Sequence, residues 1–269
     1  MSETRTDVPT VWQRHTTVEV LARNAVWLAI IIAVLVSIRR VNIIWEFLWD
    51  APEQMSDLIS RMWPIDFAYY PDSVHGALME TFHIATLGTL FTMVLGLPLA
   101  VLAANNITPY RVVNLFAKFW LVATRSVNSL VWALLFVAVF GPGPLAGMVA
   151  IAFRSIGFVG KLLGEALESV APGPIEALKA AGASRFQQLW YGYWPAIRPA
   201  FWSIILLRWD INVRESAVLG LVGAGGLGMI LNAAIDLFEW ERVAMILLTI
   251  FIVVVVVEIV ITRFRRTLI

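Results

Sequence analysis

The chain has 269 residues, of which 59% are hydrophobic and 14% are charged, and its net charge is +1. Soluble domains carry about 25% charged residues, and several apolar runs here approach the ~20 residues that cross a bilayer, so the composition predicts a membrane protein. The near-neutral charge excludes a polyanionic partner such as a nucleic acid. The absence of cysteine excludes disulfides and thiolate metal sites.

The first 75 residues are predicted to form an amino-terminal region. It combines a polar cytoplasmic end, a short membrane span at 25–38 and an amphipathic segment at 42–75 on the outer side. Arg39 and Arg40 end the span, where long cationic side chains can reach the interface. Tryptophan and tyrosine are typical of the interfacial layer, and the segment contains five of them: Trp45, Trp49, Trp63, Tyr69 and Tyr70.

Residues 76–269 are predicted to form an all-helical membrane core. Uniform apolar runs favour helices, because the strands of a β-barrel alternate in polarity. A sharp break at Gly141–Pro144 separates two of the runs. We expect five more spans, and thus six in all, at 84–104, 126–140 (with a helical lead-in from 111), 145–163, 199–222 and 243–262.

Lysine and arginine predict the orientation, since cytoplasmic segments of membrane proteins carry more of them. Their distribution places both termini and the long loop at 165–199 in the cytoplasm. The turn at 141–144 and the glycine-rich run at 223–228 then lie outside. That run formally matches the dinucleotide-binding pattern G-x-G-x-x-G, but the pattern needs a preceding strand, so we interpret it as a turn.

Ionisable residues interrupt the fifth span. Each costs about 2.5–3.5 kcal/mol at mid-bilayer on insertion scales. Asp210 and Arg214 are four apart and share one helical face, whereas Arg208, Asn212 and Glu215 share a roughly opposite face. Either a polar solute path or an ion-pair network between helices explains them. We expect Asp210–Arg214 to be mainly structural, and Arg208 with Asn212 to lie nearer a path.

The loop at 165–199 is polar and punctuated by glycine and proline. Pro172-Gly173-Pro174 is expected to stop one helix, and 175–181 to form a short new helix that Gly182 ends. Its order resembles the cytoplasmic coupling loop of ABC importer permeases, in which E-A-A is followed after three residues by G, and nine residues later by I-x-L-P. The coupling residues implied by this resemblance are Glu176, Ala177, Gly182, Ala183 and Ser184; the departures from the pattern are Leu178, Gly192 and Trp194.

Further runs resemble the phosphonate-uptake permeases in particular. The run Asp210-Ile-Asn-Val-Arg214 is similar to an E-I-N-V-R run in that family, with aspartate in place of glutamate, and the glycine-rich run 218–228 follows it. Arg125-Ser126 and the run 130–134 resemble the family's third span. We include Ser126 and Asn128 from this region among the candidate path residues.

The resemblance implies a type I importer fold in a bacterial cell membrane. It also implies a homodimer with two ATP-binding subunits and an extracytoplasmic solute-binding protein, so that ATP and Mg²⁺ belong to the ATPase and this chain carries no cofactor or metal. The implied solute is a small phosphorus oxyanion, phosphonate first, then phosphite or phosphate. A permease for another solute such as methionine is one alternative. A proton- or sodium-coupled secondary transporter that uses Glu80, Asp210 and Glu215 as proton carriers is the other.

Overall fold

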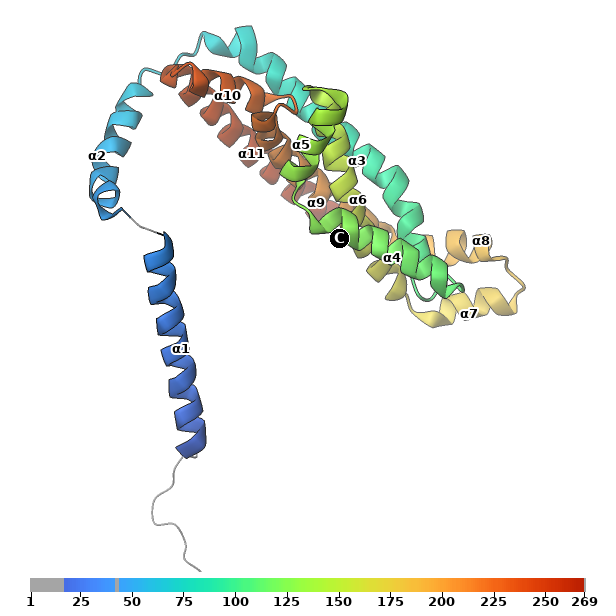
Figure 1. Cartoon of the computed structure of the whole chain (residues 1–269). Coiled ribbons are helices and arrows are strands. Elements are labelled where there is room, and N and C mark those ends of the chain that lie inside the picture. Colours follow the sequence, from blue (N-terminus) through green and yellow to red (C-terminus); the bar gives the residue numbers. More distant parts are fainter. Residues whose placement is uncertain (1–16, 42–43, 269) are drawn as a thin grey trace, which may run out of the picture. The chain divides into compact units, whose positions relative to one another are not determined.

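The computed structural model describes residues 17–41 and 44–268, which form helices joined by short loops (Figure 1). The chain divides into two compact units, Met1–Asp57 and Leu58–Ile269. Among the described residues, five helices are long and apolar enough to cross a membrane, or six if one bent pair counts as a single span. The predicted all-helical fold is confirmed, and the predicted count of six spans is reached if the bent pair is counted as one span. The predicted boundary at residue 75, between the amino-terminal region and the permease core, stays a prediction.

The amino-terminal unit contains α1 (Thr17–Val41), which is longer than the span predicted at 25–38. None of the residues in its apolar stretch 18–41 is buried within the protein. A helix that is hydrophobic on all sides is typical of a segment surrounded by lipid. Arg39 and Arg40 lie in its last turn.

Helix α2 (Trp45–Arg61) is amphipathic and has no buried residue. Its large apolar side chains follow the 3.6-residue helical period, and its acidic side chains lie between them: Trp45, Leu48, Trp49, Met55 and Ile59 against Glu46, Asp50, Glu53 and Asp57. This pattern is typical of helices that lie in a membrane interface. The outer-side location stays a prediction.

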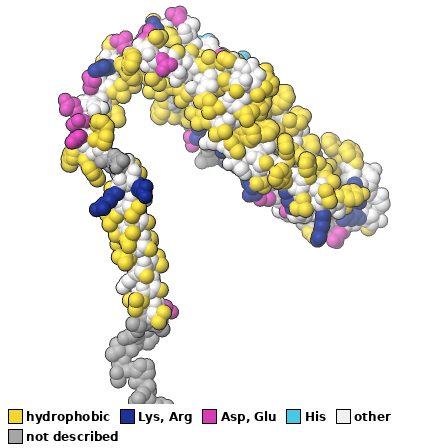
Figure 2. Space-filling view, in the orientation of Figure 1, with side chains coloured by type: hydrophobic (Ala, Val, Ile, Leu, Met, Phe, Trp, Pro, Cys, Tyr) yellow, Lys and Arg dark blue, Asp and Glu magenta, His cyan; other side chains and the backbone are white. Residues whose placement is uncertain are grey.

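Helix α6 (Pro144–Glu168) forms the centre of the second unit. It packs against four other helices, which are α3 (His75–Ala103), α4 (Arg111–Ser126), α5 (Ser129–Phe140) and α9 (Trp194–Leu219). The bundle is elongated, with the loop after α6 at one end (Figure 1). Hydrophobic side chains cover much of the visible surface of the bundle, and charged ones gather along one edge and at that end (Figure 2).

Glycines on α6 allow the neighbouring helices to approach closely. A methyl group on Gly157 would lie 2.4 Å from Thr124 Oγ1 and 2.5 Å from the carbonyl oxygen of Leu121. A methyl group on Gly160 would lie 2.4 Å from Leu121 Cδ2. Small residues at such crossings let the backbones of membrane helices come into contact, so α4 lies directly on α6.

The third span differs from the prediction of one helix at 126–140. Ser126 ends α4, and α5 begins at Ser129 after a bend of 91°. The bend is stabilised by Asn128, whose side-chain oxygen accepts a hydrogen bond from Leu130 N at 3.1 Å and caps α5. The 12 residues of α5 extend about 18 Å, which is less than the ~30 Å hydrocarbon core. This span is therefore broken.

The carboxyl-terminal helices pack along α9. Helix α9 begins at Trp194 and continues through Pro199, so the fifth span starts earlier than the predicted residue 199. Helix α10 (Leu227–Asp236) follows a glycine turn, and α11 (Trp240–Leu268) packs against α9 and α10. Gly223, Gly225 and Gly226 have φ of 83°, 89° and 74°. This left-handed backbone favours glycine and confirms the predicted turn.

The close crossing of α4 and α6 can be tested with two alanine substitutions in the same helix. Gly157→Ala places a methyl group against Thr124 and should lower the free energy of unfolding by about 1–3 kcal/mol, as overpacking does. Gly164→Ala is the matched control, because its new methyl group would meet its nearest neighbour, Ala100 O, at an ordinary 3.5 Å. The control should be neutral or more stable by up to about 1 kcal/mol. Thermal unfolding in nanodiscs checks this; equal midpoints for the two variants would contradict the packing.

Candidate functional site

A chain of hydrogen bonds links α9 to α6 and α3 through buried polar side chains. Arg208 Nε donates to Ser155 Oγ at 2.7 Å, and Ser155 Oγ donates to Asn212 Oδ1 at 3.0 Å. Asn212 Nδ2 donates to Thr89 Oγ1 at 2.8 Å. Arg208 is 3% exposed and Asn212 is fully buried. Each of these buried polar side chains has a hydrogen-bond partner. The series of hydrogen bonds therefore fixes the position of α9 against α6 and α3 and leaves none of these side chains unpaired.

Glu215 pairs with two arginines that come from different helices. Its Oε2 lies 3.3 Å from Arg208 Nη2 on α9, and its Oε1 pairs with Arg154 Nη1 on α6. The Arg154 side chain is 29% exposed and that of Glu215 is 19% exposed. Arg208 is thus held inside the protein, whereas Arg154 presents part of its guanidinium to open space.

These charged groups line a hollow of about 500 Å³, which we call the arginine hollow. Its seven lining residues come from α4, α6 and α9: Arg125, Ser126, Arg154, Phe158, Arg208, Ile211 and Glu215. The hollow combines three arginines with one carboxylate, so cations are in excess. Guanidinium groups bind planar or tetrahedral oxyanions through paired N–H donors, and the arrangement can therefore hold a small anion.

The structure brings together three of the seven path residues predicted from the sequence, namely Ser126, Arg208 and Glu215. Asn212 lies behind them in the hydrogen-bond chain, and Asn128 caps α5 instead of lining the hollow. The sequence analysis missed Arg154 and did not include Arg125 among the candidate path residues. The signal for Arg154 is a single arginine in the predicted span 145–163, since ionisable residues in spans are rare and functional.

Asp210 and Arg214 form an ion pair on α9, as their four-residue spacing predicts. The Asp210 side chain is 7% exposed and that of Arg214 is 43% exposed. Asp210 Oδ1 is buried and has no hydrogen-bond partner among the described residues. The pair lies apart from the arginine hollow, whose lining includes neither residue.

The loop after α6 contains a short helix, α7 (Pro172–Ala180), at the end of the bundle (Figure 1). The expectation that Pro172-Gly173-Pro174 stops the preceding helix is wrong, because α6 already ends at Glu168 and these residues form the first turn of α7. Proline fits a first turn, where its missing N–H needs no partner.

Gly182 ends α7, as predicted. It adopts φ +80°, its N–H bonds to Lys179 O at 3.0 Å, and Ala183 N–H bonds to Leu178 O at 3.0 Å. This is the Schellman arrangement that satisfies the last carbonyls of a helix. Ser184 and Gln187 then form a capping box that starts the next turn, α8 (Arg185–Gln187). The loop is therefore defined by its own hydrogen bonds.

One side of α7 packs on the bundle, and the other is exposed. Ile175 is buried and Leu178 is half-buried, whereas Glu176 and Ala177 are exposed. A methyl group on Gly192 would lie 2.5 Å from Ile175 Cδ1. The coupling pattern has isoleucine at position 192. Glycine there leaves room for the Ile175 side chain, so that α7 can pack on the bundle.

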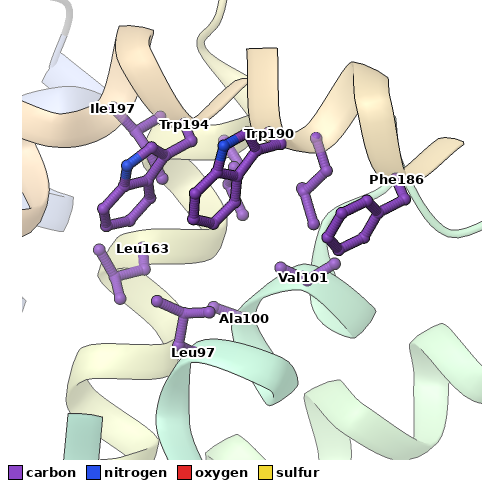
Figure 3. A pocket seen from close by; sticks show the side chains of 10 residues that line it. Leu97, Ala100, Val101, Leu163, Phe186, Trp190, Trp194 and Ile197 are labelled. Carbon is purple, nitrogen blue, oxygen red and sulfur yellow. The ribbon is translucent and has the colours of Figure 1, made fainter. Parts of the chain in front are cut away.

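Aromatic rings connect the loop to α9. Phe186, Trp190 and Trp194 stack in sequence at centroid distances of 6.4 and 6.5 Å, and Trp194 contacts Phe201 edge-on at 5.1 Å. They border an apolar pocket of about 280 Å³, where the indoles of Trp190 and Trp194 face Leu97 of α3 (Figure 3). Aromatic contacts therefore join the loop to α9.

The glycine turn before α10 is held by the start of α3. Glu80 Oε1 accepts a hydrogen bond from Gly226 N at 3.2 Å, and Thr81 Oγ1 accepts one from Leu227 N at 2.9 Å. These groups cap the amino terminus of α10, where a carboxylate also favours the helix dipole. Glu80 thus has a structural partner.

Comparison with known proteins identifies the family. Residues 96–269 match the family described as "Binding-protein-dependent transport system inner membrane component". The chain belongs to this family. The permease is 37% identical over 207 residues to the "Putative phosphite transport system permease protein HtxC" of Stutzerimonas stutzeri, a match that covers 77% of this chain and 73% of the relative.

Two further similarities support the assignment. The permease is 34% identical over 219 residues to the "Phosphate-import permease protein PhnE" of Mycolicibacterium smegmatis, covering 81% of this chain and 41% of that one. Its fold matches a chain of the inward-facing MetNI methionine ABC transporter with a TM-score of 0.62 and 22% identity, covering 73% of this chain and 96% of the other. The permease thus has the type I ABC importer fold.

Family membership defines the role of the chain in its complex. It is a multi-pass inner membrane protein and the permease component of an ABC importer, which works with an ATPase and a solute-binding protein. ATP hydrolysis belongs to the separate ATPase subunit, and permease subunits of this family carry no cofactor.

The Asp210–Arg214 pair gives a prediction about folding. Arg214→Ala leaves the buried Asp210 carboxylate without its partner and should lower the free energy of unfolding by about 2 kcal/mol. This is less than the ~3–5 kcal/mol for a fully buried pair, because Arg214 is 43% exposed. The double variant Asp210→Asn/Arg214→Ala should recover most of the loss. Folded yield and unfolding midpoints in nanodiscs measure both effects, and a double variant no more stable than Arg214→Ala would refute the pairing.

Proposed function

We propose that this permease works as a homodimer that imports a small phosphorus oxyanion, with phosphonate, phosphite and phosphate as the candidate solutes. The observation that carries the proposal is the arginine hollow, in which three arginines face one carboxylate. The names of two relatives support it, since one is named as a phosphite transport permease and the other as a phosphate-import permease.

The hollow suits an anion because of its charge balance. An ion that enters a low-dielectric region without a counter-charge loses its hydration at a large cost. Glu215 neutralises one guanidinium, and the remaining positive charge is available to a solute. Arg154 is the contact that we favour, because its side chain is 29% exposed and arginine binds phosphate-like oxygens in pairs. Arg208 and Asn212, being almost fully buried, form the wall behind it.

A second copy would complete the path. Arg214 is 43% exposed on α9, and ionisable residues in membrane spans face water or another protein, not lipid. The arginine hollow lies on the same helix and is also open on one side. An interface between two copies over the open side of the hollow would shield its charges from lipid. It would also supply two coupling loops for a pair of ATPase subunits.

Transport would follow alternating access. We infer that α7 seats on the ATPase in the cytoplasm through its exposed residues Glu176 and Ala177, with Gly182, Ala183 and Ser184 fixing its direction. Closure of the ATPases on ATP moves α7, and the aromatic stack Phe186–Trp190–Trp194 carries the movement into α9. The excess of lysine and arginine on the same side supports a cytoplasmic position for the loop and both termini.

One alternative solute has support. The permease is 30% identical over 190 residues to a "Probable D-methionine transport system permease protein MetI" of Pasteurella multocida. Methionine is zwitterionic and needs less net positive charge than the hollow supplies. Membership of an ATP-driven family removes the proton-coupled alternative, and Glu80 has a capping role instead.

The substrate can be tested with the assembled complex. Proteoliposomes with the ATPase and the solute-binding protein are supplied with labelled methylphosphonate, phosphite, phosphate or methionine, and native mass spectrometry counts the permease copies. Arg154→Gln should lower oxyanion transport about 10- to 100-fold, the equivalent of a charged hydrogen bond of about 1.5–3 kcal/mol. It should still fold, because Glu215 keeps its partner Arg208.

The control is Arg242→Gln, which removes a cation near the start of α11 outside the hollow. This variant should transport like the wild type. Transport of methionine but of none of the three oxyanions would overturn the proposed substrate. Wild-type oxyanion transport by Arg154→Gln would overturn the proposed site.

The coupling loop gives a separate prediction. Gly182→Trp should abolish solute-stimulated ATP hydrolysis while membrane insertion is retained, because φ +80° costs other residues about 1–2 kcal/mol and the bulky ring alters the end of α7. Gly173→Ala is the control in the same helix, since its methyl group would meet nothing within 4 Å. A Gly182→Trp complex with full coupled transport would rule out the coupling role.

A further inference from the structure

A second polar hollow adjoins the arginine hollow and shares Arg125 with it. This inner hollow has a volume of about 290 Å³. Its charged lining consists of Lys118 and Arg125 from α4, and Lys161, Glu165 and Glu168 from α6. Glu168 is the last residue of α6, so the inner hollow lies toward the coupling-loop end of the bundle.

The cations follow the seam between α4 and α6. Lys118 and Arg125 are seven residues apart on α4, and Arg154 and Lys161 are seven apart on α6. Seven residues make nearly two turns of a helix, so each pair lies on one face. Gly157, between the α6 pair, is in close contact with Thr124 and Leu121 of α4. The packing that brings the helices together therefore also aligns their cations.

The partners of these cations leave positive charge available. Lys161 Nζ lies 3.4 Å from Glu165 Oε1, and Lys118 Nζ donates to Asn105 Oδ1 at 2.7 Å. Glu168 Oε1 accepts from Asn105 N at 2.7 Å. Arg125, the residue common to both hollows, forms no ion pair with any residue that the structure describes.

We propose that the inner hollow is a second binding site for the transported oxyanion, and that Arg125 passes the anion from the arginine hollow to Lys118 and Lys161. This inference rests on the proposed import of an oxyanion, and it adds a binding site that the solute reaches after the arginine hollow. The ligand class is a small tetrahedral oxyanion, and the direction is toward the end of the bundle that carries the coupling loop.

The two hollows differ in a way that suits release. The arginine hollow has three arginines against one carboxylate, whereas the inner hollow has three cations against two carboxylates. In the inner hollow, the side chains of Lys161 and Glu165 are 45% and 56% exposed. Water and salt therefore weaken the attraction between Lys161 and an anion. Lysine also binds as a point charge and lacks the paired donors of arginine. A solute should therefore be held more loosely there, as exit from a path requires.

The chain contains no cysteine, which allows a test by thiol labelling. The single-cysteine variant Val122→Cys replaces an exposed apolar lining residue and keeps all the charged residues of the inner hollow. It is prepared as the full complex in nanodiscs and treated with an anionic or a cationic methanethiosulfonate of similar size. Each rate is divided by the rate of the same reagent with a free thiol. On this scale the anionic reagent should react at least fivefold faster than the cationic one, because Arg125 and Lys118 attract it. Inorganic phosphate or phosphite should slow this labelling. Adding Arg125→Gln should reduce the preference for the anionic reagent.

Ser169→Cys is the matched control, because Ser169 is exposed directly after α6 and does not line the hollow. It should show neither a preference for the anionic reagent nor protection. Equal rates of the two reagents at residue 122, or no protection by any oxyanion, would overturn the inner site. Protection by sulfate but not by phosphate or phosphite would leave the inner site standing and overturn the proposed substrate class.

Discussion

Glu215 provides the interaction on which the centre of the permease depends. Its carboxylate pairs with Arg208 on its own helix and with Arg154 on α6. A lone guanidinium in a membrane span is costly, so each arginine is tolerated because this carboxylate is present. One carboxylate cannot neutralise two arginines, and Arg125 adds a third cation. The same arrangement that makes the charges compatible with a membrane leaves net positive charge in the hollow, and the proposed anion site rests on this charge.

The glycines of α6 explain why the charged residues meet. Gly157 brings α6 against the backbone of α4, and Gly160 leaves room for the Leu121 side chain. The bend at Asn128 turns the chain away before α5. This ends α4 at Ser126, directly beside Arg154 and Glu215 in the arginine hollow. Close packing and the end of α4 at Ser126 therefore contribute to the hollow together with its charges.

The coupling loop and the site are connected through α9. The loop is fixed by its own caps, Gly182 at the end of α7 and Ser184 at the start of α8. Trp194 begins α9 and stacks on Trp190 of the loop, while Arg208 and Glu215 lie further along the same helix. In the proposed mechanism, α9 links ATPase movement to the site, because it carries Trp194 at one end and Arg208 and Glu215 along its length.

Local chemistry in the sequence determined much of this protein. Apolar runs predicted the all-helical membrane fold, the spacing of Asp210 and Arg214 predicted their ion pair, and Gly182 predicted the end of α7, because each depends on helical periodicity or on one backbone conformation. The bend before α5 and the start of α7 at Pro172 depend on local caps that the apolar pattern does not show. Only the tertiary structure decided the joining of Arg125 and Arg154 with Glu215. This joining depends on the packing of helices whose residues lie up to 90 positions apart (125 to 215), which no local pattern specifies.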